Sequence, residues 1–403
     1  MAIRVRILQE SPIRLWGLTS RERLERMLSK AGVTADQEQT GPVAAGDSVL
    51  LLRGDFLYDQ RIIKNIIGTV GIVLEASTPQ GLRPVAAHVA GEMADHMETL
   101  LGEDSRCDYP QGLRRESPET LAVAFMKELL KFDVPYILPI NEKNRRTLET
   151  RLFAGSYKGV TDLVTKWLWP VPAQWATGLC TRYDISPNQV TTLSLVFSIF
   201  AGILFYHGYY ITGLVFAWLM TFLDTVDGKL ARVTLNYSAF GNIFDHVIDL
   251  VFPPIWYIAW ALSLQSILGL SAAFAIWMVM AGYVVGRLVE GIFTKFLESS
   301  GIFCWQLIDS CFRLITGRRN PNLVLLTASL FFGRPDLGLL AVCLWTVLSS
   351  GFLVARLVMA IQARRKSGPL RSWFLDLDPA NDDLSFCQRW FCRRPEGESG
   401  KNA

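Results

Sequence analysis

The chain has 403 residues, of which half are apolar and only 19% are charged, and it contains 12 tryptophans and 23 phenylalanines. This composition excludes an ordinary soluble protein, and the length exceeds that of one typical domain. The formal net charge of +3 is too small to argue for or against a nucleic-acid partner, and we expect none. The seven cysteines include no CxxC pair, so we expect reduced thiols, not a disulfide framework or a zinc site.

Residues 1–150 are charged and mixed in character, and they predict a soluble α/β domain. Short apolar runs that are typical of strands alternate with segments of helical period. Such alternation favours a largely parallel sheet. The expected strands are IRVRIL, SVLLLRG, VGIVLEAS and RPVAAHVAG, and the expected helices are SRERLERMLSKAG, DQRIIKNIIG and ESPETLAVAFMKELLKF (116–132).

The segment 151–186 combines cationic and tryptophan side chains. It contains Lys158, Lys166 and Arg182 together with Trp167, Trp169 and Trp175. This mixture is typical of a helix that lies in the membrane interface. The alternative is a linker helix packed on the soluble domain. Because a long apolar stretch follows at once, we favour the interfacial helix.

Residues 187–366 predict an all-α membrane domain with six transmembrane helices. A helix needs about 20 residues to cross a bilayer, and the fifth stretch reaches that length only if its helix begins before Asn320. The lysines and arginines gather on one side of the connections, which by the positive-inside rule places both chain ends in the cytosol. The apolar stretches cover residues 188–206, 211–232, 240–264, 270–294, 321–333 and 337–363.

The ends of the chain add two expectations. The first residues lack the continuous apolar core of a signal peptide. Residues 367–403 form a polar segment that we expect to be a mobile cytosolic tail. The fold class is therefore mixed, and the protein is expected to be a multi-pass protein of a bacterial cell membrane.

Four aspartates lie at the ends of the second and third apolar stretches that are expected to face the cytosol. Asp224 and Asp227 are three residues apart, and Asp245 and Asp249 are four apart, so each pair shares one face of a helix. Charges inside a membrane segment are costly and indicate function. Close carboxylates also repel one another unless cations hold them together. Only two cations, Lys229 and Arg232, are local, so the pattern predicts one or two bound Mg²⁺ or Mn²⁺ ions.

The aspartates belong to a longer spaced pattern, D-x2-D-G-x2-A-R-x8-G-x3-D-x3-D, which the sequence matches at all eight fixed positions. At average residue frequencies a chance match is on the order of one in ten million. On these residues the segment 186–365 resembles the CDP-alcohol phosphotransferase family. The eight positions are Asp224, Asp227, Gly228, Ala231, Arg232, Gly241, Asp245 and Asp249.

The resemblance implies transfer of a phospho-alcohol group from a CDP-linked donor, such as CDP-diacylglycerol, to an alcohol acceptor with release of CMP, in phospholipid biosynthesis. It implies a homodimer with its active site at the cytosolic face, and Asp249 as the general base. His246 lies on another helical face and is expected to be structural. The implied metal ligands are Asp224, Asp227, Asp245 and Asp249, and the implied CDP-binding residues are Asp224, Asp227, Gly228, Ala231, Arg232 and Gly241.

Two arginines lie deep within later apolar stretches, where an unpaired charge is costly. Arg287 and Arg356 are therefore predicted to contact a phosphate. A phosphorylated acceptor such as inositol phosphate or glycerol phosphate would explain them. A neutral acceptor would need less positive charge.

The N-terminal half resembles a nucleotidyltransferase domain of the kind fused to this family in inositol-phosphate cytidylyltransferase/di-inositol-phosphate-phosphate synthase proteins. In that resemblance the strand-end Asp55 would help to hold metal and nucleotide. The glycine-rich phosphate loop of those enzymes is absent, so we predict a degenerate domain with a structural or regulatory role. Two rival functions stay open, an ion-coupled transporter and a membrane-anchored nucleotidyltransferase.

Overall fold

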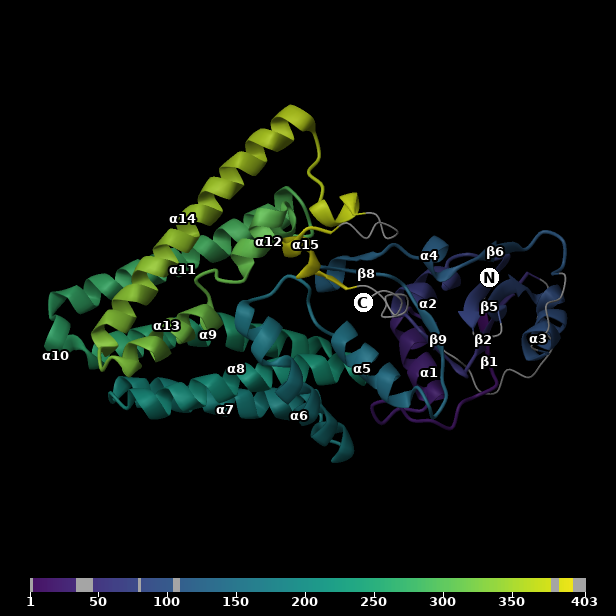
Figure 1. Ribbon diagram of the computed structural model, residues 1–403, viewed down its shortest axis with the longest axis horizontal. Coiled ribbons are helices and arrows are strands. Elements are labelled where there is room, and N and C mark those ends of the chain that lie inside the picture. Colours follow the sequence, from purple (N-terminus) through teal and green to yellow (C-terminus); the bar gives the residue numbers. More distant parts are fainter. Residues whose placement is uncertain (1–2, 34–45, 79–80, 104–108, 378–383, 394–403) are drawn as a thin grey trace, which may run out of the picture.

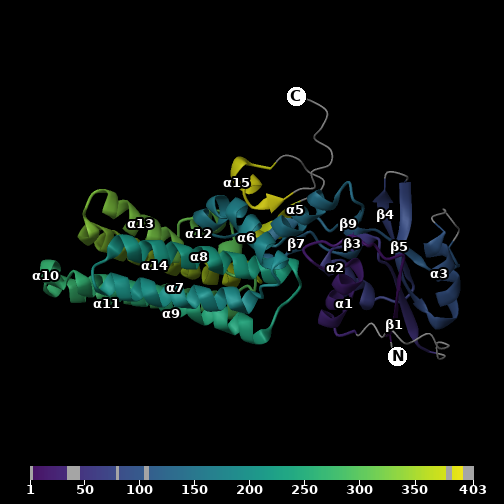
Figure 2. The ribbon, with the colours of Figure 1, turned by 90° about the horizontal axis from the view of Figure 1, so that it is seen from below.

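The computed structural model describes residues 3–33, 46–78, 81–103, 109–377 and 384–393. An α/β domain and a helical bundle are joined end to end along the long axis of the molecule (Figure 1 and Figure 2). The two halves expected from the sequence are therefore both present.

The α/β domain contains a five-stranded sheet with the strand order β1-β2-β5-β4-β6. β1 pairs with β2 and β4 with β6 in parallel, whereas β5 is antiparallel to both β2 and β4. The sheet is therefore mixed, and the prediction of a largely parallel sheet is wrong, because the link between β4 and β5 is too short for a crossover. The strands are β1 (Ile3–Leu8), β2 (Ser48–Arg53), β4 (Ile72–Thr78), β5 (Gly81–Ala90) and β6 (Arg114–Glu116).

Helices cover both faces of this sheet. Alternate residues of β2 point to opposite sides, so that Leu50 and Leu52 pack with helices α1 and α2, and Val49 and Leu51 pack with α3. The apolar layer that contains Leu50 and Leu52 fixes the position of α1. Helix α1 also contacts the helical bundle. The helices are α1 (Ser20–Lys30), α2 (Gln60–Ile67) and α3 (Ala94–Gly102), the last preceded by the 3-10 turn η1 (Gly91–Met93).

The predicted helix 116–132 is wrong. The segment begins with the last residue of β6 and then forms two short helical turns and two short strands. It does so because Phe125 and Phe132 are packed against the C-terminal segment. Tertiary packing therefore overrides the helical period of this segment. Its elements are α4 (Pro118–Leu121), β7 (Phe125–Met126), η2 (Lys127–Leu129) and β8 (Lys131–Asp133), followed by β9 (Ile137–Pro139), which pairs with β3 (Phe56–Tyr58), and by α5 (Arg145–Gly155).

Residues 367–377 and 384–393 of the C-terminal segment are packed on the rest of the protein. For these residues the prediction of a mobile tail is wrong. Strand β10 (Cys392–Arg393) pairs with β8, and helices η5 (Trp373–Asp376) and α15 (Phe386–Arg389) lie beside α12. Phe374 is 1% exposed and stacks on Phe125 with the ring centres 5.2 Å apart. The buried aromatic residues of the segment explain why it packs on the domain.

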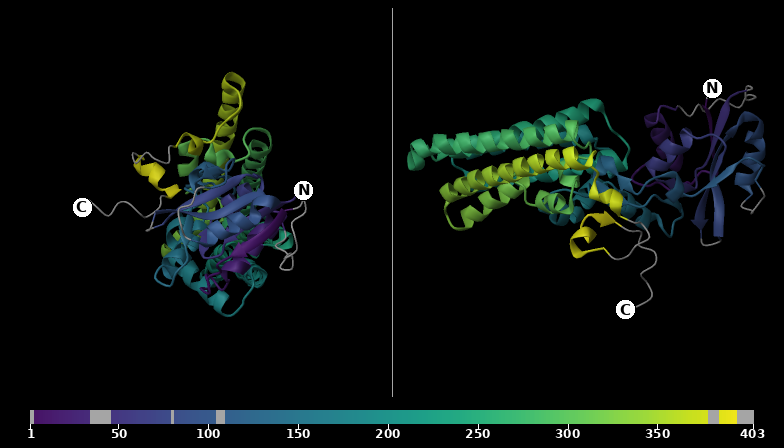
Figure 3. Two further views of the ribbon diagram at one scale, coloured as in Figure 1. Left: turned by 90° about the vertical axis from the view of Figure 1, so that its right-hand side faces the viewer. Right: turned by 90° about the horizontal axis from the view of Figure 1, so that it is seen from above.

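The helical half matches the predicted apolar stretches closely. Figure 3 shows α11 and α14 lying side by side along the bundle. The helices are α6 (Pro170–Arg182), preceded by the π-helical turn η3 (Val164–Leu168), α7 (Pro187–Tyr206), α8 (Tyr210–Val233), α9 (Ala239–Ser263), α10 (Gln265–Leu268), α11 (Leu270–Phe296), η4 (Ile302–Cys304), α12 (Leu307–Arg313), α13 (Arg319–Phe331) and α14 (Pro335–Ser367).

Among the described residues, five helices are long and apolar enough to cross a membrane: α7, α8, α9, α11 and α14. The fifth predicted crossing corresponds to α13, which has only 13 residues. At 1.5 Å per residue this is about 20 Å, short of a bilayer core of roughly 30 Å. A sixth crossing therefore stays a prediction.

The turn between α8 and α9 enters the core of the α/β domain. Leu235 has a φ of 53°, in the left-handed region that favours glycine, and its side chain is only 3% exposed among the residues of α1 and α2. The left-handed conformation costs a leucine about 1–2 kcal/mol. Burial of a leucine side chain contributes roughly 1.5–3 kcal/mol and can offset that cost. The two halves are therefore joined by packing as well as by the chain.

The packing of Phe374 yields a stability prediction. Phe374→Ala leaves a cavity between the C-terminal segment and β7, and we expect it to lower the free energy of unfolding by about 3–5 kcal/mol. Leu375→Ala is the control, because Leu375 is 46% exposed and its loss should cost less than about 1 kcal/mol. Denaturant unfolding of the detergent-solubilised protein measures both values. Equal values for the two variants would show that the segment does not stabilise the fold.

Candidate active site

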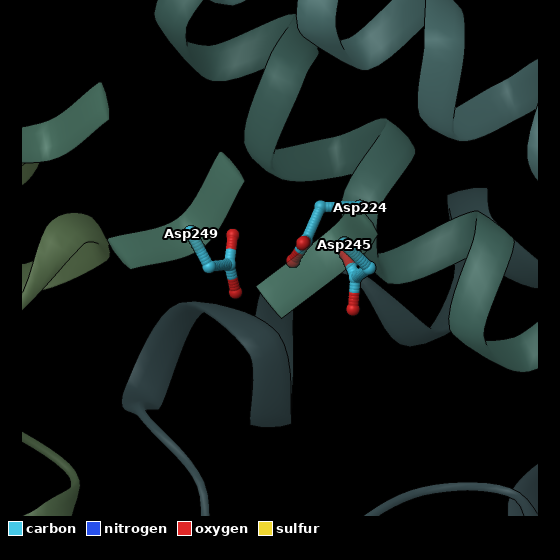
Figure 4. Close-up of side chains that lie close together, drawn as sticks. All are labelled: Asp224, Asp245 and Asp249. Carbon is cyan, nitrogen blue, oxygen red and sulfur yellow. The ribbon is translucent and has the colours of Figure 1, made fainter. Parts of the chain in front are cut away.

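The aspartate motif lies on α8 and α9, which are joined by the turn 234–238. Asp224 lies near the end of α8, and Asp245 and Asp249 lie near the start of α9. One carboxylate oxygen from each of these three residues lies within 4.8 Å of the other two. Figure 4 shows the three side chains gathered around a common space. The convergence predicted from the spacing is therefore present for three of the four aspartates.

Asp227, the fourth aspartate, is placed differently. It is buried, and its Oδ2 accepts a hydrogen bond of 2.6 Å from Thr191 Oγ1 on α7. It does not belong to the cluster of three. The sequence could not distinguish it from its neighbours, because one helical turn separates it from Asp224 and the contact with Thr191 comes from another helix.

Two adjoining cavities surround the cluster. The central cavity, of about 620 Å³, is lined by Asp224 and Asp249 and reaches residues of α12 and of the segment 158–165. The side cavity, of about 370 Å³, is lined by Asp227, Ala231 and the turn 234–238. Five residues line both cavities and mark where they meet: Lys158, Gly228, Arg232, Asp245 and His246.

The start of α9 lies very close to the start of α7, and Gly241 is required there. A Cβ atom at Gly241 would collide with the side chains of Asn188 and Ser238. The hydroxyl of Ser238 accepts a hydrogen bond of 2.8 Å from the Gly241 amide and caps α9. The missing side chain therefore allows the two helix ends to approach closely, and Gly241 also lines the side cavity.

Arg319, at the first position of α13, contacts two of the clustered aspartates. Its Nη2 donates to Asp224 Oδ2 at 2.5 Å, and its Nη1 donates to Asp249. From the sequence, Arg319 is only one of the lysines and arginines that gather on one side of the apolar stretches. It lies 95 residues from Asp224 along the chain, so no local pattern could have indicated this contact.

Lys229 and Arg232, the local cations, do not neutralise the aspartates by direct contact. The Lys229 Nζ lies 3.9 Å from the centre of the Tyr157 ring, and Arg232 Nη1 donates to the Ser156 carbonyl at 3.3 Å. Both side chains thus face the segment after α5. Arg232 remains on the lining of both cavities.

The donor set fits a divalent cation. Three carboxylates face one guanidinium, which leaves two uncompensated negative charges within a small volume. Carboxylate oxygens are the ligands that Mg²⁺ and Mn²⁺ prefer in proteins. Asp224, Asp245 and Asp249 are therefore the residues that could hold such an ion, and Asp227 could reach it only by a change of rotamer.

Three further cations line the central cavity together with the aspartates: Lys158, Arg313 and Arg318. Arg313 Nη1 and Arg318 Nε are buried and have no hydrogen-bond partner among the described residues. Burial lowers the pKa of Arg313 to about 9, and the charge of Arg318 adds to this effect. Burial also lowers the pKa of Lys158. Arg313 therefore stays protonated near neutral pH, and a bound anion would relieve the repulsion among these cations.

The two arginines predicted to contact a phosphate have other partners. Arg287 donates to Glu290 at 2.6 Å, and Glu290, which lines the central cavity, also pairs with Arg318. Arg356 forms a two-pronged ion pair with Asp309, at 2.5 and 2.8 Å, and does not line the central cavity. The charge of Arg356 is therefore already compensated. Arg313 and Arg318 line the central cavity, whereas Arg287 does not, so they are better placed to contact a phosphate there.

The segment 156–166 contributes to the site, although the sequence indicated only an interfacial helix. Gly159 donates to the Leu129 carbonyl at 2.8 Å, and a Cβ there would collide with Lys131. Asp162 accepts from Asn320 beside α13. The segment is therefore fixed against both halves of the molecule and places Lys158 at the cavity. The exposed side chains of Val171 and Trp175 on α6 agree with an interfacial position, which stays a prediction.

Asp55, the strand-end aspartate of the α/β domain, has a charge partner of its own. Both its oxygens accept from Arg53, at 3.0 and 2.7 Å, and Arg53 is buried. Both oxygens of Asp55 are therefore occupied by one guanidinium, whereas Asp224 and Asp249 each give a single oxygen to Arg319. The loss of nucleotidyl transfer stays a prediction.

The site also agrees with comparisons to known proteins. Residues 184–298 match the family model described as CDP-alcohol phosphatidyltransferase. This region contains the aspartate motif, so the class of protein that the match indicates is a transferase of phospholipid synthesis. The chain is also 38% identical over 66 residues to the archaetidylinositol phosphate synthase of Pyrococcus horikoshii. That alignment covers 16% of this chain and 35% of the relative, so the chain spans about a third of the relative's length.

The cluster yields a metal-binding prediction. Asp245→Asn removes one charged ligand, and we expect the affinity for Mn²⁺ to fall by at least about tenfold, since even outer partners of metal ligands are worth 10–100-fold. Electron paramagnetic resonance of free Mn²⁺ measures the affinity in the purified protein. Asp336→Asn is the control, because Asp336 pairs with Arg334 at the start of α14. An unchanged affinity in Asp245→Asn would remove Asp245 from the ligand set.

Proposed function

We propose that the protein is an integral membrane CDP-alcohol phosphotransferase that moves a phospho-alcohol group from a CDP-linked donor to an alcohol acceptor and releases CMP. The observation that carries the proposal is the convergence of Asp224, Asp245 and Asp249 where the two cavities meet. The acids lie at one depth on two consecutive helices. A transport path would instead need acidic residues spread along several spans.

The donor's CDP group is assigned to the side cavity. Gly228, Ala231 and Arg232 line it, and Asp227 lies at its inner wall. Small residues leave room for the nucleotide, and the guanidinium of Arg232 is suited to a phosphate oxygen. The lipid or alcohol part of the donor, such as the diacylglycerol of CDP-diacylglycerol, would extend toward the membrane.

Asp224, Asp245 and Asp249 would hold Mg²⁺ or Mn²⁺, with Asp227 as the fourth expected ligand. When bound, the ion would neutralise charge that develops on the CMP leaving group. The protein's part is to present the carboxylates from two helices and to hold Asp224 and Asp249 in place through Arg319.

Asp249 is the proposed general base. As the acceptor hydroxyl attacks the phosphorus that carries the alcohol, a new P–O bond forms and the P–O bond to CMP breaks. The hydroxyl proton passes to an Asp249 oxygen, which must lie within hydrogen-bond reach of it. Asp249 faces the central cavity, so the acceptor would approach from the side opposite the nucleotide.

The cationic wall of the central cavity favours a phosphorylated acceptor. Arg313, Arg318 and Lys158 line this cavity together with Asp224, Asp245 and Asp249. Inositol phosphate or glycerol phosphate would place its phosphate on this wall and a hydroxyl near Asp249. The relative named for an inositol phosphate lipid supports the first choice. The cytosolic orientation and the homodimer are parts of the proposal that come from the family resemblance.

Turnover tests the proposed base. Asp249→Asn cannot accept the proton, and we expect the kcat of metal-dependent CMP release from CDP-diacylglycerol to fall by about 10²–10⁴-fold at saturating Mg²⁺. The assay follows labelled CMP with inositol phosphate or glycerol phosphate as acceptor. Asp336→Asn should retain the wild-type rate. A loss smaller than tenfold in Asp249→Asn would rule out Asp249 as the base.

The KM values of the acceptor and of the donor together test whether the cations of the central cavity bind the acceptor. Arg313→Met removes one charged donor, and we expect the KM of the phosphorylated acceptor to rise about ten- to hundredfold, with the donor KM within twofold of wild type. Arg334→Met, an exposed residue at the far end of the bundle, is the control. If free inositol serves as well as its phosphate in the wild-type protein, the acceptor is neutral and the assignment of these cations is wrong.

A further inference from the structure

Helix α1 of the α/β domain contacts the end of the motif helix α8. Arg23 Nη2 donates to the Val233 carbonyl at 3.0 Å, and Arg26 Nη1 donates to the Thr234 carbonyl at 2.6 Å. These carbonyls belong to the last turn of α8, where backbone acceptors have no partner within the helix. Cations at a helix C-terminus also interact favourably with its dipole. The α/β domain therefore supplies the C-terminal cap of the helix that carries Asp224.

The residues that follow fix the direction of the chain between α8 and α9. The Asn236 amide donates to the Ala231 carbonyl at 2.9 Å across the left-handed Leu235, in the pattern of a Schellman motif. Glycine normally occupies this position. Leucine is present instead, and its side chain is buried with α1 and α2. The turn is thus held by the core of the other domain.

The same turn forms a wall of the side cavity. Asn236, Tyr237 and Ser238 line it, opposite Asp227 and Arg232. The Lys30 Nζ lies 3.3 Å from the centre of the Tyr237 ring, in a cation–π contact from the last residue of α1. One face of α1 therefore contacts the helix end, the turn and the aromatic residue of the cavity wall.

We propose that the α/β domain is a positioning element of the nucleotide cavity, in which α1 holds the turn 234–238 and thereby sets how tightly the CDP group is bound. The identity of the ligand rests on the proposed function. The contact between α1 and the turn 234–238 does not depend on that function. Arg23, Arg26, Lys30 and Leu235 are positioning residues and touch neither substrate nor reacting atoms. Because coupling between sites is reciprocal, nucleotide in the side cavity also stabilises α1.

Hydrogen exchange of the full-length protein without ligand tests the contact itself. Leu235→Gly keeps the backbone conformation but loses the buried side chain. In this variant the amides of residues 235 and 236 should exchange at least about tenfold faster than in wild type. The double variant Arg26→Gln, Lys30→Gln should behave in the same way. Arg21→Gln is the matched control, because Arg21 lies on α1 but pairs with Glu10 and Glu25. Wild-type exchange in both test variants would overturn the proposal.

CMP binding and turnover test the consequence for the nucleotide. In the double variant the Kd of CMP with Mg²⁺ and the donor KM should both rise about five- to tenfold, with kcat and acceptor KM within twofold of wild type. Arg26→Lys, combined with native Lys30, should recover most of the affinity. Unchanged CMP affinity in a variant with faster exchange would contradict the positioning role. If CMP fails to bind the wild-type protein, the proposed function is wrong, and hydrogen exchange alone then decides whether α1 holds the turn.

Discussion

The repulsion among three carboxylates is the constraint on which the rest of the structure depends. Two unit charges about 4 Å apart at the protein surface interact by roughly 4 kcal/mol at an effective dielectric constant of 20. Asp224, Asp245 and Asp249 lie within that range of one another on two different helices. The helices α8 and α9 would be pushed apart at this point unless other contacts held them. Those contacts come from every part of the chain.

Each of these contacts acts at a different place. Arg319 supplies a positive charge between Asp224 and Asp249. Gly241 lets the start of α9 lie against α7, and Leu235 ties the turn before it to the α/β domain. A divalent cation would neutralise the charge that remains. The protein therefore compensates part of the repulsion, and the negative charge that remains suits the cluster to a divalent cation.

Local information in the sequence was sufficient for the elements of the site but not for its surroundings. The spacing of the aspartates predicted their convergence, and the apolar stretches predicted the helices to within a few residues, because both depend on helical geometry alone. Arg319 lies 70 residues from Asp249, and the contact of Phe125 with Phe374 joins two segments that are far apart in the chain. Such contacts arise from packing between distant segments. The same cause explains why segment 116–132 departs from its helical pattern and why the ion pair of Arg356 with Asp309 could not be predicted from the sequence.

The α/β domain contributes to the geometry of the motif turn through its contacts with the end of α8. Its strand-end Asp55 is held by Arg53, so the charge that a nucleotidyltransferase would use on a metal is satisfied internally. Its helix α1, in contrast, directs Arg23 and Arg26 at backbone carbonyls of another domain. Leu235 makes the point most clearly, because a leucine in a left-handed conformation is costly unless the side chain gains more from burial than the backbone loses. That gain exists only while the α/β domain is folded against α8. The geometry of the motif turn is thus tied to the folding of the neighbouring domain.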